Sequence, residues 1–101
     1  MPQLYEYFGL MVFFYANEHE PVHVHGRRQG REARAEIEIT AGSVTGLTFT
    51  RSAGRPALTP PEQRRFEELV TARADDIVGK WIDYFVLNKS ISPERITTRL
   101  K

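Results

Sequence analysis

A long apolar stripe at helical spacing fills the second half of the chain and constrains the fold more than any other feature. From Phe66 to Phe85 the apolar side chains recur every three or four residues, and most charged side chains lie off the stripe. The stripe follows Thr59-Pro60-Pro61-Glu62, a capping-box sequence with proline at the first helical position. This pattern predicts one long helix from Pro60 to about Asn88, with a bend near Gly79.

The first half of the chain has the patterns of β-strands. Residues 10–15 are apolar without alternation, which is typical of a central strand covered on both faces. Residues 22–25, 33–39 and 47–50 alternate, with the charged side chains of 32–38 expected on an outer, solvated face. Gly46 breaks the last pattern and predicts a bulge, and residues 94–100 predict an additional edge strand.

These elements predict an α+β fold. We expect an antiparallel sheet of four or five strands packed on one long C-terminal helix, in two layers. The 101 residues form a single domain, 1–101, because the length suits one core and no linker or repeat interrupts it.

Composition excludes several kinds of chemistry. The chain has no cysteine, so disulfides, thiolate metal sites and cysteine nucleophiles are ruled out. Its 14 basic and 13 acidic side chains give a formal charge of +1, and therefore any affinity for nucleic acid must come from a local patch. The longest apolar run, residues 10–16, is too short to span a membrane, and no secretion signal is visible. We expect a cytoplasmic protein without a membrane partner.

All three histidines lie within seven residues, in the segment Asn17-Glu18-His19-Glu20-Pro21-Val22-His23-Val24-His25. On a strand, His23 and His25 share one face because successive side chains alternate. Arg27 continues that face, and His19 could fold back toward it across Pro21. Arg28, Arg31 and Arg34 follow closely, so imidazoles and guanidinium groups are expected together.

Three interpretations of this segment remain open. In the leading one, His23 or His25 is a general acid/base, His19 assists, and Arg27, Arg28 and Arg31 bind phosphates, so that the chain binds or cleaves RNA without a metal. In the second, His19, His23 and His25 bind zinc or another divalent transition metal. In the third, the histidines hydrogen-bond carboxylates and carbonyls, and the arginines belong to a solvated hairpin.

The same segment resembles a known family. Phe8, Gly9 and Tyr15, followed by Glu18, His19, Pro21, His23 and His25, are similar to the opening of small bacterial proteins in the domain of unknown function 4160 family. The family has no established activity. The resemblance implies a toxin-like protein of a toxin–antitoxin pair, which favours RNA chemistry; an enzyme of this kind would be a metal-independent ribonuclease with no cofactor.

The partners that follow are RNA and an antitoxin-like protein. A second copy of the chain is a further candidate, because the apolar stripe widens toward the end of the helix with Tyr84, Val86 and Leu87. A non-enzymatic interaction module is therefore the third functional hypothesis.

Overall fold

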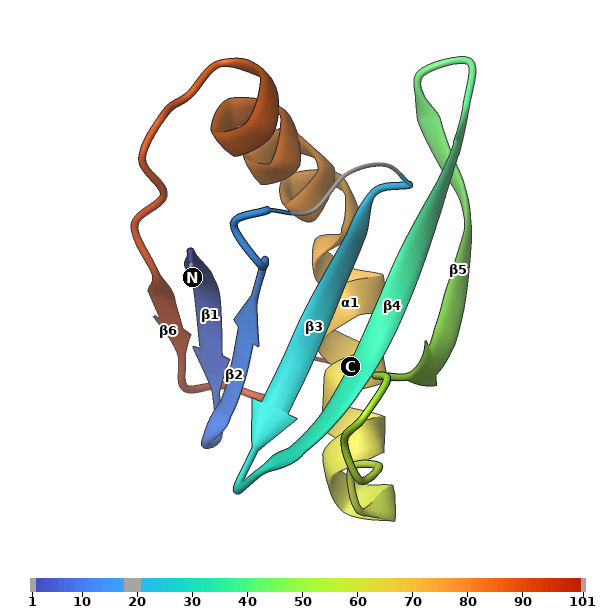
Figure 1. Cartoon of the computed structure of the whole chain (residues 1–101), viewed down its shortest axis with the longest axis vertical. Coiled ribbons are helices and arrows are strands. Elements are labelled where there is room, and N and C mark those ends of the chain that lie inside the picture. The colour runs from blue at the N-terminus through green and yellow to red at the C-terminus, as the bar shows by residue number, and fades with distance from the viewer. Residues whose placement is uncertain (1, 18–20, 101) are drawn as a thin grey trace.

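The computed structural model describes residues 2–17 and 21–100 of the chain. It contains a six-stranded sheet in the order β5-β4-β3-β2-β1-β6, and one long helix crosses one face of this sheet (Figure 1). The strands are β1 (Gln3–Tyr7), β2 (Leu10–Phe13), β3 (His23–Arg28), β4 (Arg31–Thr40), β5 (Ser43–Arg51) and β6 (Glu94–Ile96). The predicted α+β class with two layers is confirmed.

The strand count exceeds the four or five predicted, because residues 3–7 form a strand that the pattern did not reveal. Leu4, Tyr5 and Tyr7 of β1 are all buried, so the segment lacks the alternation of a half-buried strand. Strand β1 is antiparallel to β2 and parallel to β6. The edge strand predicted in residues 94–100 is therefore present, but it is short and parallel to its neighbour.

Three two-residue turns set the register of the hairpins. In each turn a glycine with positive φ follows a residue that also has positive φ, which is the backbone of the hairpin turns whose twist matches that of the flanking strands. These turns join β1 to β2, β3 to β4 and β4 to β5, and they are formed by Phe8–Gly9, Gln29–Gly30 and Ala41–Gly42. The bulge predicted at Gly46 is also present, as a register shift opposite Glu38 and Ile39.

Helix α1 (Pro60–Trp81) begins where the capping box predicts. The Thr59 amide donates to Oε1 of Glu62 over 2.9 Å, which satisfies one backbone donor at the helix start. Inside the helix the non-helical residue is Arg73, with φ −116° and ψ 16°, and the predicted bend at Gly79 is wrong. Because glycine has no Cβ, Gly79 allows the helix to bend but does not cause a bend. A π-helical turn, η1 (Ile82–Val86), follows Trp81. The helical segment therefore ends at Val86, two residues before the predicted end at Asn88.

The core lies between α1 and the helix-facing side of the sheet. Buried side chains of α1 pack against buried side chains from β1 to β4, including Phe66, Leu69, Ile77, Val12, Val24 and Ala35. None of the helices in the described part of the chain is long and apolar enough to cross a membrane. Within the described residues, α1 covers this one face of the sheet, and the His25 side chain of β3 lies on the other face.

Candidate functional site

Strand β3 presents its side chains to two different faces. Gly26 lies under the helix, where an added Cβ would come within 2.5 Å of the Phe66 ring. Because side chains alternate along a strand, His25 and Arg27 lie on the opposite, outer face. His23, the first residue of β3, shares this alternation, and its ring also packs against that of Trp81 at the end of α1, 5.4 Å between centroids. The ring centroids of His23 and His25 are 5.2 Å apart. The two imidazoles therefore share a face, as the alternation predicts.

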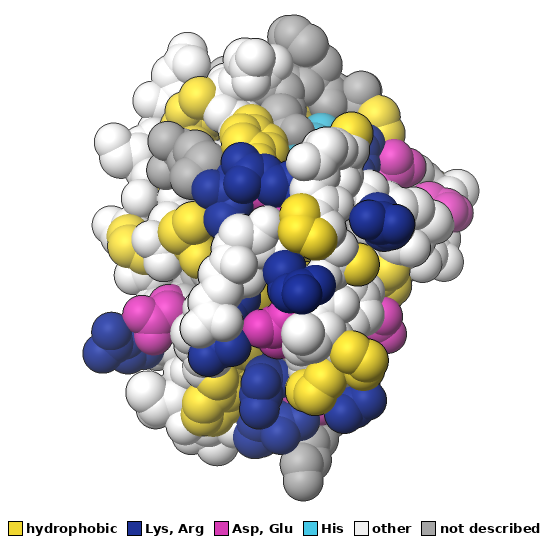
Figure 2. Space-filling model, turned by 60° about the horizontal axis from the view of Figure 1, so that its bottom comes forward, with side chains coloured by type: hydrophobic (Ala, Val, Ile, Leu, Met, Phe, Trp, Pro, Cys, Tyr) yellow, Lys and Arg dark blue, Asp and Glu magenta, His cyan; other side chains and the backbone are white. Residues whose placement is uncertain are grey.

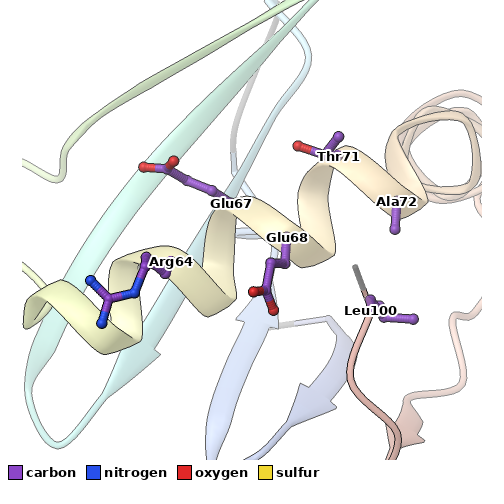
Figure 3. A pocket seen from close by; sticks show the side chains of 6 residues that line it. All are labelled: Arg64, Glu67, Glu68, Thr71, Ala72 and Leu100. Carbon is purple, nitrogen blue, oxygen red and sulfur yellow. The ribbon is translucent and has the colours of Figure 1, made fainter.

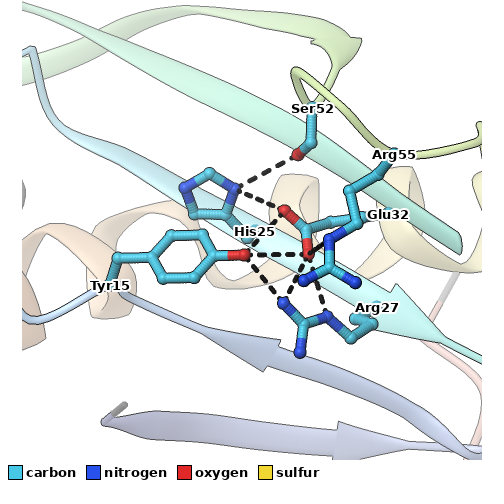
Figure 4. Close-up of polar contacts among 6 residues, drawn as sticks. All are labelled: Tyr15, His25, Arg27, Glu32, Ser52 and Arg55. Atoms are coloured by element: carbon cyan, nitrogen blue, oxygen red, sulfur yellow. Dashed lines mark hydrogen bonds and ion pairs between the residues drawn. The ribbon is translucent and has the colours of Figure 1, made fainter. Parts of the chain in front are cut away.

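Glu32 stands at the centre of the polar contacts on this face (Figure 4). It is the cross-strand partner of Arg27, whose Nε donates to Oε1 of Glu32 over 2.9 Å. The Tyr15 hydroxyl donates to the same carboxylate at 3.0 and 3.1 Å, and it accepts from Nη2 of Arg27 at 2.7 Å. Nδ1 of His25 lies 3.4 Å from Oε2 of Glu32, and Nε of Arg55 lies 3.8 Å from Oε1.

The expectation of a charged, solvated outer face on β4 is wrong at Glu32, which is only 1% exposed. Burial acts to raise the pKa of the Glu32 carboxyl, but hydrogen bonds from Ser52, Arg27 and Tyr15 outweigh it and hold the pKa below its usual range. Glu32 is therefore a buried carboxylate that keeps its negative charge at neutral pH.

The loop after β5 closes one side of this cluster. The Glu32 amide donates to the Pro56 carbonyl over 3.0 Å, which ties the loop to β4. Ser52 is buried, and its Oγ lies 3.3 Å from Nδ1 of His25. Next to these side chains lies a surface hollow of about 450 Å³, lined by Arg51, Ser52, Ala53, Gly54, Arg55 and Pro56. The hollow thus has Arg55 in its lining, next to the carboxylate that contacts the histidine.

The atoms that face Nδ1 favour one tautomer in both histidines. Nδ1 of His23 lies 2.7 Å from the Pro21 carbonyl oxygen, which can only accept, so this nitrogen carries the hydrogen. Nδ1 of His25 lies near the Ser52 hydroxyl and the ionised Glu32 carboxylate, and the negative charge of the carboxylate favours a hydrogen on this nitrogen. In the neutral rings the lone pair is therefore on Nε2, the atom that accepts a proton or binds a metal ion.

Not all the predicted site residues come together. Arg28 lies on the helix side, where Nη1 is 3.0 Å from Oε2 of Glu62. Arg31 donates to the Ala57 carbonyl, and Arg34 pairs with Glu36 on the outer face. His19, with Glu18 and Glu20, lies outside the described residues. The structure thus places His23, His25 and Arg27 together and holds Arg28 and Arg31 elsewhere.

Basic side chains are not segregated into one patch. Figure 2 shows Lys and Arg side chains spread over one face of the molecule, with acidic side chains between several of them. Most arginines have a carboxylate within ion-pair distance; the pairs include Arg27–Glu32, Arg28–Glu62, Arg34–Glu36 and Arg99–Glu68. An anionic ligand would therefore be bound at a local site rather than by a broad field.

Four residues of the cluster were missed from the sequence: Tyr15, Glu32, Ser52 and Arg55. For Glu32 a signal existed, because a two-residue turn at Gln29–Gly30 pairs Arg27 with Glu32 by simple counting. Ser52 and Arg55 lie on an irregular loop, whose path no periodicity reveals.

A second hollow of about 430 Å³ lies on the outer side of α1, beside the C-terminal segment (Figure 3). Its lining includes Arg64, Glu67, Glu68 and Leu100. Glu68 bonds Arg99 and accepts from the Tyr7 hydroxyl, while Glu67 accepts from Gln63. These carboxylates are engaged in holding the helix and the C-terminal segment, so this hollow lacks a cluster of reactive groups like that around His25.

No group of three His, Cys, Asp or Glu side chains that could hold a metal ion occurs among the residues that the structure describes. The predicted set of His19, His23 and His25 is represented there only by its two strand members. The His23 and His25 ring centroids are 5.2 Å apart, and Nδ1 of each ring lies near an oxygen atom, as in histidines that bind zinc through Nε2.

Comparison with known proteins identifies the class of this chain. Residues 9–82 match the family described as "Domain of unknown function (DUF4160)", which covers β2 to β5 and all of α1. The chain therefore belongs to the DUF4160 family, and the resemblance seen in the sequence is confirmed. The comparisons with curated proteins and with solved structures found no match.

Proposed function

We propose that the outer-face cluster binds RNA and cleaves it without a metal ion, with His25 as the acid/base group. The observation that carries this proposal is the contact of His25 with Glu32: the carboxylate lies 3.4 Å from Nδ1 of His25. A histidine whose Nδ1–H faces a carboxylate is held in one tautomer and becomes a better proton acceptor at Nε2.

Arginines complete the site for a phosphodiester. Arg27 and Arg55 both approach Glu32, and their side chains are 21% and 41% exposed, so their guanidinium groups reach the surface beside the hollow. Guanidinium groups bind phosphate oxygens in pairs and stabilise the charge that develops on them. Arg27 and Arg55 are the phosphate-binding residues that we favour, in place of Arg28 and Arg31.

The reaction that suits these groups uses the RNA's own 2′-hydroxyl as nucleophile. His25 Nε2 takes the proton of the 2′-hydroxyl, the 2′-oxygen bonds to phosphorus, and the bond from phosphorus to the 5′-oxygen breaks. The leaving 5′-oxygen takes a proton, for which the neighbouring His23, when protonated, is the candidate donor. The toxin-like role that the family resemblance implies fits this chemistry, with an antitoxin-like protein as its partner.

The test is cleavage of single-stranded RNA by the purified chain in EDTA. We expect products ending in a 2′,3′-cyclic phosphate, no cleavage of 2′-deoxy oligonucleotides, and a loss of roughly 10²-fold or more in His25→Ala. Arg55→Ala is expected to weaken binding, whereas Arg64→Ala, the same charge change on the exposed side of α1, is the control. A wild-type chain that neither binds nor cleaves RNA would contradict the proposal.

A second candidate function is metal binding by His23 and His25. The observation favouring it is that both rings direct Nδ1–H at an oxygen acceptor, the orientation that protein ligands of zinc adopt. His19 would be the third ligand. Titration calorimetry with Zn²⁺ on untagged protein tests this: binding lost in His23→Ala and His25→Ala is expected, and absence of binding to the wild type excludes it.

A further inference from the structure

The two edges of the sheet are built differently. At one edge, β6 has only three residues, follows Pro93 and carries the charged pair Glu94 and Arg95. Short strands, proline and charge are the features by which natural proteins keep an edge from pairing. At the other edge, β5 has nine residues, without proline and without a charged side chain from Ser43 to Thr50. The β5 edge lacks these three features, and its bulge beside Gly46, which is also protective, precedes residues 47–51.

The direction of the backbone groups of β5 follows from those of β4. The Ile37 amide of β4 donates to Val22 on the β3 side, and the Glu32 amide points the opposite way, to Pro56. Backbone groups alternate along a strand, so the even-numbered residues of β4 face β5. Their partners in β5 include Thr48, opposite Glu36, and Thr50, opposite Arg34. Leu47 and Phe49 therefore direct their amides and carbonyls away from β4, at the open edge.

We infer that this edge pairs antiparallel with β5 of a second copy of the chain, with Thr48 opposite Thr48 of the partner subunit. This register sets Leu47 opposite Phe49 of the partner subunit, and Phe49 opposite the partner's Leu47. Each of these positions has its backbone groups directed outward, so both pairs form ladder hydrogen bonds. The two sheets join into one, and both helices lie on the same side of it.

Charge and side-chain chemistry favour a second copy as the occupant. Arg51 falls opposite the partner's Thr45, so no like charges meet across the seam. Thr–Thr pairs are among the favourable cross-strand pairs, and the Phe49–Leu47 pairs bring apolar surfaces together. Leu47 and Phe49 are only partly buried within one chain, and Phe49 packs its ring against Phe66, 5.9 Å between centroids. Pairing would cover these two side chains further, and it would bring the partner's hairpin beside the hollow that begins at Arg51.

Light scattering of the full chain over a concentration series tests the inference. The paired segment, residues 45–51 of each chain, is a small interface, so we expect a dimer that dissociates at concentrations on the order of 10⁻⁵ to 10⁻⁴ M. Leu47→Pro removes an outward amide and is expected to abolish the dimer, since proline is tolerated in an edge strand whose amide faces away from its neighbour. Leu47→Ala removes the same packing but keeps the amide, and it is expected to retain most of the dimer.

Hydrogen exchange in the wild-type protein gives an independent measurement, which does not depend on the folding of a variant. The amides of Leu47 and Phe49 are expected to become protected as the concentration rises, while those of β6 do not. A strict monomer at concentrations on the order of 10⁻³ M would overturn the inference. A dimer that Leu47→Pro leaves intact would also overturn it. So would a dimer whose β5 amides stay unprotected and which is abolished by Val86→Lys, a substitution at the exposed end of the helix.

Discussion

Nδ1 of His25 lies 3.4 Å from Oε2 of Glu32, although the two residues are diagonal neighbours on adjacent strands rather than cross-strand partners. The direct partner of Glu32 is Arg27. The Glu32 carboxylate therefore contacts both the guanidinium group of Arg27, directly opposite, and the imidazole of His25, diagonally beside it. Several measurable consequences depend on this position.

Replacing Glu32 with Gln is expected to lower the free energy of unfolding by roughly 2–4 kcal/mol, because it removes a buried charge from its partners. Urea denaturation measures this change. Glu36→Gln is the matched control on the same strand and face, since its pair with Arg34 is partly exposed, and we expect a change of at most about 0.5 kcal/mol. Equal effects of the two substitutions would contradict a central role for Glu32.

The lowered pKa of Glu32 predicts a particular pH dependence. Between the ordinary pKa of a glutamate, 4.5, and the lower pKa of folded Glu32, the unfolded chain binds more protons than the folded one. Stability is therefore lost as the pH falls through this range and is fully present above it. Glu62 and Asp76 also have lowered pKa values, so the wild type must be compared with Glu32→Gln. The variant should lose less stability on acidification; identical slopes would count against the assignment.

Tyr15→Phe is expected to cost about 1–2 kcal/mol. The substitution keeps the ring, whose centroid lies 4.6 Å from that of His25, and removes the hydroxyl that donates to Glu32 and accepts from Arg27. Thermal unfolding monitored by circular dichroism gives the change. A neutral result would show that water replaces the hydroxyl without loss.

Two glycine substitutions are expected to act in opposite directions. Gly26→Ala forces a Cβ to within 2.5 Å of the Phe66 ring and should destabilise the protein by about 1–3 kcal/mol. Gly79→Ala meets no atom within 4 Å in α1, so the gain in helix propensity should stabilise it by roughly 0.5–1 kcal/mol. Denaturant midpoints of the two variants, compared with the wild type, test both signs.

Salt dependence tests the phosphate-binding role of Arg55 in the proposed RNA site. Removing one side chain that neutralises a phosphate should reduce the slope of log K against log salt by about 0.7 for single-stranded RNA. We expect this reduction for Arg55→Ala, next to the hollow, and an unchanged slope for Arg64→Ala. Fluorescence anisotropy with a labelled oligonucleotide supplies the values, and equal slopes for both variants would place the RNA elsewhere.

The parts of the fold that were predictable depend on local signals. Thr59 and Glu62 mark the helix start by their chemistry and spacing, and Gly46 marks a bulge by breaking an alternation. Strand β1 was not predictable, because a register shift between Gln3 and Tyr5 breaks its alternation, and because its parallel neighbour β6 lies about ninety residues further along the chain.

The candidate site was predictable only in part for a similar reason. Alternation places His23, His25 and Arg27 on one face, but it does not say what covers that face. Tyr15 reaches it from the end of β2, and Ser52 and Arg55 reach it from a loop. Such contacts between distant segments leave no periodic trace in a single sequence.

A sheet that packs against a helix on one face must also bury part of its other face. In this protein, charged and polar side chains cover much of that second face. Tyr15, Arg27, Glu32 and Ser52 form a thin third layer held by hydrogen bonds instead of apolar contacts. Folding and the proposed chemistry therefore draw on the same atoms. A substitution that altered the ligand preference of this cluster would also change the free energy of unfolding. Adaptation at the site would therefore require compensating substitutions in the core.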